Sequence, residues 1–169
     1  MKRVIQVLSL SLVMGLASDV IAASVFFIVP LDGSQEAPGP GDPDGTGSAF
    51  FSIDPGALTI DWNITANDID FPLTGAHIHV APAGAPGPIV VDFSAQLSGT
   101  GLVDADLAGV LANPTGYYIN LHNAAFPAGA IRGQFGKPIP EPSTLTLAAI
   151  GAASLGLSRR RTARCAASE

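Results

Sequence analysis

Turn-forming residues divide the middle of this chain into short segments, and this spacing constrains the fold more than any other feature. The 169 residues include 19 glycines and 14 prolines, and between residues 24 and 136 they separate apolar stretches too short for ordinary helices. Within Ala57–Thr65, apolar and polar side chains alternate, which is the period of a strand with one buried face. Short strands at regular spacing predict an all-β domain, an antiparallel Greek-key-like sandwich or barrel.

The other predicted strands are also apolar segments bounded by turns. Asp54-Pro55-Gly56 predicts a tight turn that joins the strands on either side into a hairpin. One short helix is expected at Asp104–Leu111, with Asp104 as its candidate cap. The predicted strands are Ser24–Leu31, Gly47–Ile53, Ala57–Thr65, Leu73–Val80, Ile89–Ser94, Gly116–His122 and Ala130–Phe135.

Residues 1–23 have the layout of a secretory signal peptide. Lys2 and Arg3 precede the apolar segment Val4–Ala17, and Ala22 and Ala23 are small residues of the kind that signal peptidase requires. The alternative is a retained membrane anchor. The short apolar segment and the cleavage-type sequence after it favour removal by signal peptidase.

The C-terminal residues 137–169 have three parts. Pro140-Glu141-Pro142 is followed by residues 143–158, which carry no charge, and then by Arg159, Arg160, Arg161 and Arg164. This layout resembles the PEP-CTERM sorting signal of Gram-negative bacteria. The resemblance implies transient anchoring of an apolar helix over 143–158 in the inner membrane, with the arginines on the cytoplasmic side. It also implies cleavage by an exosortase and delivery to the cell surface or extracellular matrix; a permanent C-terminal anchor is the alternative.

The segment between these two ends is strongly acidic. Residues 24–136 contain eleven acidic residues and a single basic one, Arg132. Such a charge argues against nucleic acid as a partner. The single cysteine, Cys165, excludes an internal disulfide framework and a cysteine-rich zinc site. We expect Arg132 to be partly buried and paired with Glu36 or a nearby aspartate, because an unpaired buried charge is costly.

All three histidines lie in this acidic segment. His77 and His79 are two apart on a predicted strand, so their imidazoles share one face about 7 Å apart. His122 ends another predicted strand, and if the two strands are neighbours the three rings converge on a site for one zinc or copper ion. The alternatives are that these histidines are structural, contact a partner, or form a pH-sensitive contact.

No other constellation indicates catalysis, and we expect no enzymatic activity. The sequence has no phosphate-binding glycine loop with lysine, no GxSxG motif and no Cys–His pair. Asp42 and Asp44, in a glycine-rich turn, are candidates for weak calcium binding, with a solvated turn as the alternative.

Four segments in order resemble the CHRD domain, named after the repeats of chordin, and define a domain over residues 24–136. In animals such domains lie in a secreted protein that binds growth factors, and the resemblance implies no settled activity in bacteria. We therefore expect an exported, non-enzymatic binding or structural protein that contacts extracellular polysaccharide or a surface protein. The alternative function is a mononuclear zinc or copper protein with redox activity. The segments are Leu31–Pro38, His77–His79 with Gly87–Val90 after it, Tyr117–His122, and Ala128–Phe135, in which Ala130 replaces the usual acidic residue.

Overall fold

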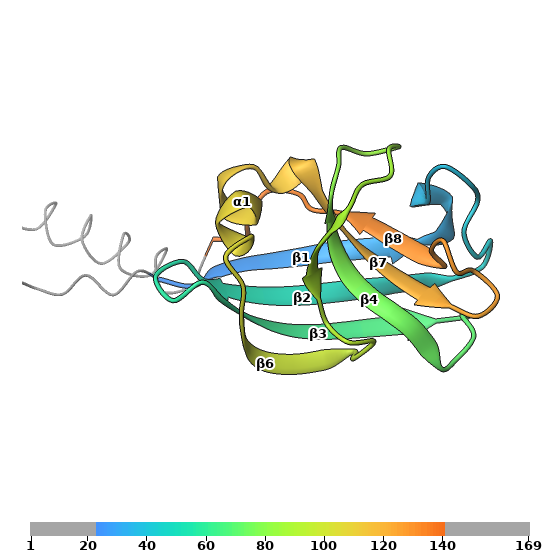
Figure 1. The fold of residues 1–169 in the computed structure, drawn as a ribbon, viewed down its shortest axis with the longest axis horizontal. Coiled ribbons are helices and arrows are strands. Elements are labelled where there is room, and N and C mark those ends of the chain that lie inside the picture. Colours follow the sequence, from blue (N-terminus) through green and yellow to red (C-terminus); the bar gives the residue numbers. More distant parts are fainter. Residues whose placement is uncertain (1–22, 141–169) are drawn as a thin grey trace, which may run out of the picture.

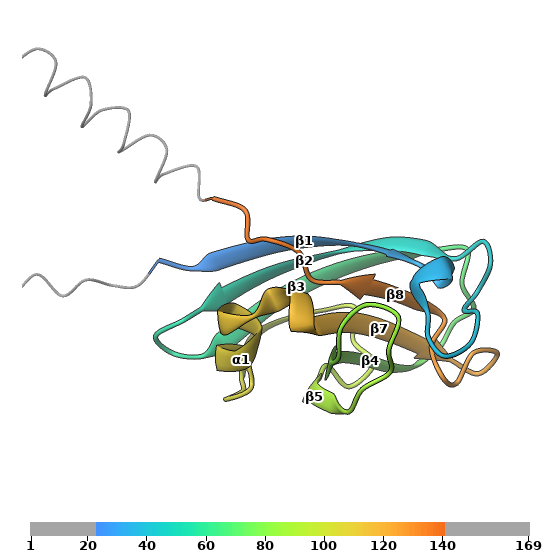
Figure 2. The same cartoon turned by 90° about the horizontal axis from the view of Figure 1, so that it is seen from above.

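The computed structural model describes residues 23–140, which form one eight-stranded antiparallel sheet curled into a half-barrel (Figure 1, Figure 2). The strands follow the order β5-β4-β7-β8-β1-β2-β3-β6 across the sheet. The predicted all-β class with one short helix is confirmed. The strands are β1 (Val25–Asp32), β2 (Thr46–Asp54), β3 (Thr59–Asn67), β4 (Leu73–Val80), β5 (Ile89–Asp92), β6 (Ser98–Val103), β7 (Tyr117–Asn123) and β8 (Ile131–Gln134).

The inner face of the curled sheet holds the apolar core. Alternate residues of each strand point into it, as their near-zero exposure shows, and phenylalanine rings pack against one another at its centre. Helix α1 (Leu107–Ala112) adds Leu107 and Val110 to this core. Asp104 does not cap α1, because its carboxylate accepts a hydrogen bond from the Asp106 N–H just before the helix.

Strand β6 is the one strand that the sequence pattern did not predict. It is rich in small residues and lacks alternation, yet it pairs with β3. Gly99 explains the composition, because a β-carbon at this position would collide with the indole of Trp62. The small residue at Gly99 therefore makes room for a large one on the neighbouring strand.

The connection between β5 and β6 links the two ends of the curled sheet. The Phe93 N–H donates to the Ala76 carbonyl on β4 at 2.9 Å, and the Ile64 N–H on β3 donates to the Leu97 carbonyl at 2.7 Å. The Trp62 indole N–H also donates to the Gln96 carbonyl at 3.0 Å. The segment 93–97 therefore holds the curvature of the sheet by bonding to both β4 and β3.

The two ends of the described chain lie together beside β1 (Figure 2). The Ile139 N–H donates to the Phe26 carbonyl at 2.8 Å, so the segment after β8 returns to the first strand. Residues 1–22 of the expected signal peptide (1–23), together with Glu141, Pro142 and the expected apolar helix over 143–158, lie outside the described residues. Within residues 23–140 no helix has the length and hydropathy of a membrane span.

Candidate metal centre

Polar side chains gather on the outer face of β4, β7 and β8, opposite the apolar core. Antiparallel pairing places His77 across from Asn120, and Asn120 across from Arg132. The loop of residues 81–88 covers part of this face, so that Arg132, Asn120 and His79 are buried. We call this group the polar layer: His77, His79, Tyr118, Asn120, His122, Arg132 and Gln134.

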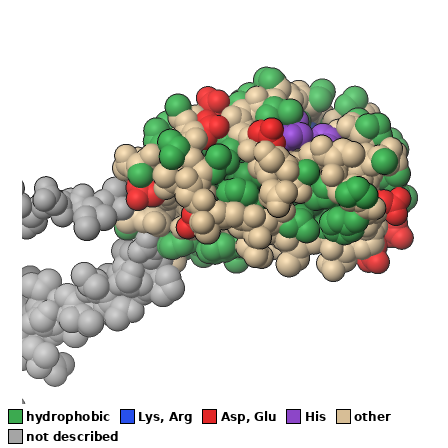
Figure 3. Space-filling view, turned by 60° about the horizontal axis from the view of Figure 1, so that its bottom comes forward, with side chains coloured by type: hydrophobic (Ala, Val, Ile, Leu, Met, Phe, Trp, Pro, Cys, Tyr) green, Lys and Arg blue, Asp and Glu red, His purple; other side chains and the backbone are tan. Residues whose placement is uncertain are grey.

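The three histidines meet at one edge of the polar layer. Each offers a ring nitrogen, and these nitrogens all lie within 4.8 Å of one another. The ring centroids are 5.0 Å apart for His77 and His122, 5.6 Å for His77 and His79, and 5.8 Å for His79 and His122. Histidine side chains are visible at the surface as a small purple patch with a carboxylate nearby (Figure 3). The sequence-predicted trio is therefore brought together by the pairing of β4 with β7.

Backbone carbonyls determine the tautomers of two of the rings. His79 Nδ1 lies 2.9 Å from the Gly87 carbonyl, and His122 Nδ1 lies 3.1 Å from the Pro127 carbonyl. A carbonyl oxygen only accepts hydrogen bonds, so each Nδ1 carries the proton. The Nε2 atoms of His79 and His122 consequently hold lone pairs, and both atoms are buried with no partner within the described residues.

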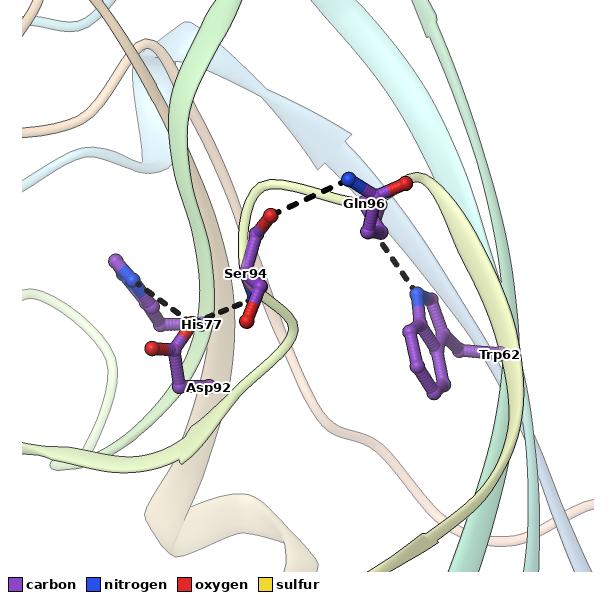
Figure 4. A network of polar contacts seen from close by, with 5 residues as sticks. All are labelled: Trp62, His77, Asp92, Ser94 and Gln96. Carbon is purple, nitrogen blue, oxygen red and sulfur yellow. Dashed lines mark hydrogen bonds and ion pairs between the residues drawn. The ribbon is translucent and has the colours of Figure 1, made fainter.

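The third ring is oriented by a carboxylate. His77 Nε2 lies 3.5 Å from Asp92 Oδ1, and that oxygen also accepts the Ser94 N–H at 2.7 Å (Figure 4). A carboxylate acceptor places the proton on Nε2, which leaves the lone pair on Nδ1. The His77 Nδ1 atom is also buried without a partner in the described part of the chain. Each histidine therefore has one nitrogen that faces an acceptor of the protein and one that has no partner within the described residues.

Burial favours the neutral form of the three imidazoles. It is the largest cause that lowers the pKa of each ring below its ordinary value. For His77 the Asp92 carboxylate opposes this shift, whereas the neighbouring histidines and Arg132 lower the pKa of His79 further. A neutral imidazole is the form that binds a metal ion.

The donor set fits a transition-metal ion. Three neutral imidazoles suit zinc or copper, and ligating histidines characteristically donate their second N–H to a carbonyl or carboxylate. Around one ion with bonds near 2.0–2.1 Å, ligand nitrogens lie roughly 3.3–3.6 Å apart. The present separations of up to 4.8 Å then require small ring rotations on binding.

Arg132 is buried as predicted, but its predicted carboxylate partner was wrong. Its guanidinium donates to the Ala85 carbonyl at 2.9 Å, the Pro82 carbonyl at 3.1 Å and Gln134 Oε1 at 3.1 Å. No carboxylate within residues 23–140 lies at ion-pair distance from it. The carbonyls of loop 81–88 solvate the charge instead.

Glu36 lies beside the polar layer in an incompletely satisfied environment. Asn120 Nδ2 donates to Glu36 Oε2 at 3.3 Å, while Glu36 Oε1 and Asn120 Oδ1 are buried without partners in the described residues. Burial raises the pKa of Glu36 to about 7, against the opposing effects of Arg132 and Asn120. Gly129, at φ 145°, leaves room for this pair, since a β-carbon there would meet both side chains.

The acidic turn is separate from the histidines. Asp42 is buried, and its pKa is raised by burial and by the nearby carboxylates of Asp44 and Asp70. Within residues 23–140 the histidines are the only group of three or more potential ligands close enough to share an ion. Calcium binding by Asp42 and Asp44 stays a prediction.

Sequence reasoning missed the groups that orient the rings. Asp92, Gly87 and Pro127 hold the three imidazoles, but nothing in the sequence places them next to a histidine. Asp92 faces His77 only because β5 pairs with β4 in one register. The carbonyls of Gly87 and Pro127 belong to loops, whose paths depend on the complete fold.

Comparison with known families gives two matches. The CHRD domain model matches residues 27–135, and the PEP-CTERM protein-sorting motif matches residues 138–161. No curated protein and no solved structure matches the chain significantly. The four CHRD-like segments of the sequence supply Glu36 and every member of the polar layer.

Proposed function

Because this chain belongs to the CHRD domain family, with residues 27–135 matching its model, we propose that its domain is an exported, non-enzymatic module that binds one copper or zinc ion. His77, His79 and His122 are the proposed ligands. The PEP-CTERM motif implies export and processing by an exosortase in a Gram-negative bacterium. Metal binding is the part of the function that the geometry supports best.

One observation carries the proposal. Three histidine nitrogens, His77 Nδ1 and the Nε2 atoms of His79 and His122, are buried and have no hydrogen-bond partner in the described structure. The same three rings also offer nitrogens that lie within 4.8 Å of one another. Leaving a buried polar atom without a hydrogen bond costs about 1–3 kcal/mol of stability. Three such atoms in neighbouring rings therefore destabilise the fold, and a purely structural role of the histidines does not account for them. A bound metal ion satisfies all three at once.

We further propose that the mature protein acts at the cell surface or in the extracellular polysaccharide, where it contacts polysaccharide or a surface protein. The sorting motif supports surface delivery. The excess of acidic residues supports a soluble domain that does not bind polyanions.

The test is the metal content of the full chain, exported to a bacterial periplasm and purified without a tag in mild detergent. Elemental mass spectrometry should find about one equivalent of copper or zinc per chain. The variant His77→Ala/His79→Ala should lose it and retain the circular dichroism of a β protein. A matched control, Asn63→Ala/Thr65→Ala on the outer face of β3, should keep its metal.

Two results would contradict the proposal. One is a folded wild-type chain that stays metal-free after incubation with copper and with zinc. The other is a histidine variant that retains the full metal content. In the first case the histidines are structural, and the search turns to partners that contact them.

A further inference from the structure

We propose that the three-histidine centre is selective for univalent copper over divalent ions, and that Arg132 determines this selectivity. This inference rests on the proposed metal binding and specifies its ligand. It comes from a buried positive charge next to an uncharged ligand set. The ring of Tyr118 stacks between the guanidinium of Arg132 and the imidazole of His79.

The stack places the guanidinium one ring away from a metal ligand. The Arg132 Cζ atom lies 3.4 Å from the centroid of the Tyr118 ring. The Tyr118 ring lies nearly parallel to the imidazole of His79, at 7° and with centroids 4.8 Å apart. Gly87 holds both rings in place, because its N–H donates to the Tyr118 hydroxyl and its carbonyl accepts from His79. The positive charge is therefore fixed in position relative to the centre.

The charge of Arg132 is not neutralised by contact. The residue is 1% exposed, and its hydrogen-bond acceptors are two carbonyls and one amide, all uncharged. Glu36 attracts it from beyond ion-pair distance.

The ligand set adds no compensating charge. All three ligands are uncharged imidazoles. The nearest carboxylate, Asp92, lies 3.5 Å from His77 but is 61% exposed, so solvent screens its charge more than that of the buried guanidinium. The repulsion between Arg132 and a bound ion scales with the charge of the ion, so a dication experiences twice the repulsion of Cu(I). Limited screening around a buried guanidinium strengthens this difference.

The coordination number favours the same ion. Zinc in proteins is almost always four-coordinate, so three histidines leave it in need of a fourth donor. The three free nitrogens are buried, which restricts the water that would supply this donor. Cu(I) is stable with three nitrogen donors and needs no fourth ligand.

The experiment compares affinities for Cu(I) and Zn(II) in the untagged full chain at pH 8. Cu(I) affinity is measured anaerobically, with ascorbate, by competition with a chromogenic Cu(I) chelator; Zn(II) affinity is measured with a zinc indicator. The readout is the ratio of the two affinities. Arg132→Gln should lower this Cu(I)-to-Zn(II) ratio at least about tenfold, because the charge that repels the dication is gone.

A second variant avoids the risk that Arg132→Gln misfolds when loop 81–88 loses its donors. Glu36→Gln keeps the shape of the side chain and removes the negative charge that partly balances Arg132. At pH 8 the wild-type carboxyl is ionised, so this variant should raise the ratio roughly threefold. Asp61→Asn, which removes an exposed carboxylate on β3 away from the histidines, is the control and should leave the ratio unchanged.

The outcomes separate the two proposals. If no metal binds the wild-type chain, the proposed function fails. If metal binds and Glu36→Gln leaves the ratio unchanged or lowers it, the selectivity mechanism fails while the metal centre stands. Opposite shifts in the folded Arg132 and Glu36 variants support the mechanism.

Discussion

The two faces of the same sheet solve different physical problems. On the inner face, alternate residues of β1, β2 and β3 bury apolar side chains whose contacts are complete within the domain. On the outer face of β4, β7 and β8, the polar layer is almost as well buried but leaves several atoms without partners. The outer face leaves buried polar atoms without partners among the described residues, and for this reason we propose that it is the functional side.

Truncating Phe51 should give the largest loss of stability. Phe51 has no exposed surface and stacks on Phe93 and Phe135, with centroids 6.0 and 5.1 Å away. Phe51→Ala should lower the free energy of unfolding by about 3–5 kcal/mol, because it leaves a cavity in a packed core. Urea unfolding followed by tryptophan fluorescence measures the change.

The control is its sequence neighbour Phe50, which points to the other side of β2 and is 42% exposed. Phe50→Ala should cost about 1 kcal/mol or less. Equal losses at the two positions would contradict the assignment of the inner face as the stabilising one.

Replacing Asp92 should separate function from stability. Asp92→Asn removes the charge that orients His77, so metal affinity should fall about 10–100-fold. The side chain is 61% exposed, and the free energy of unfolding of the metal-free protein should change by less than about 0.5 kcal/mol. Competition titrations and urea unfolding measure the two quantities.

Asp61 provides the matched control for Asp92. It is also an exposed strand aspartate that accepts one backbone N–H, that of Gly101 at 2.7 Å, but it lies on β3 away from the histidines. Asp61→Asn should leave metal affinity unchanged. A similar loss of affinity in both variants would show a general effect of surface charge and no orienting role for Asp92.

The sequence predicted the inner face more completely than the outer one. Alternation in Ala57–Thr65 identifies Ile60 and Ile64 as core residues, and both are buried. The same alternation places His77 with His79, and His122 with Tyr118, on one face of each strand. Alternation is a local property of the chain, and local reasoning is sufficient for it.

The outer face depends on contacts that no local pattern encodes. The cost of an unpaired buried charge predicted a carboxylate partner for Arg132, whereas the structure solvates it with carbonyls of the loop 81–88. Carbonyl groups occur at every residue, so the sequence does not reveal which ones converge. For the same reason, the sequence did not predict that the carbonyls of Gly87 and Pro127 contact His79 and His122.

Glu36 should give the polar layer an unusual dependence on pH. Its pKa is raised from 4.5 to about 7 in the folded protein. Between these two pH values the carboxyl is therefore protonated in the folded state and ionised in the unfolded state. Stability from this group is therefore present at low pH and is lost as the pH rises through 7. The histidines act in the opposite sense, since their lowered pKa values reduce stability as the pH falls below their ordinary value.

Glu36→Gln isolates the contribution of the carboxyl, because the histidine contributions cancel in the difference from wild type. The variant should gain about 1 kcal/mol relative to wild type between pH 5 and 8, a discounted value because the carboxyl keeps some contact with solvent. Urea unfolding of the metal-free proteins across this range provides the measurement. If the difference in the free energy of unfolding between variant and wild type does not change with pH, Glu36 does not titrate in this range.

The smallest expected effect concerns the acidic turn, which also contains a buried polar side chain but lacks a set of convergent lone pairs. Burial and the neighbouring carboxylates of Asp44 and Asp70 raise the pKa of Asp42. A weakly bound calcium ion would relieve this repulsion, and at a few times its dissociation constant it stabilises the fold by about 1 kcal/mol. Millimolar calcium should therefore raise the melting temperature by roughly 3 °C. The variant Asp42→Asn/Asp44→Asn should abolish this rise in melting temperature. If calcium leaves the melting temperature of the wild-type chain unchanged, the turn is a solvated loop. The three histidines are then the single candidate ion site within residues 23–140.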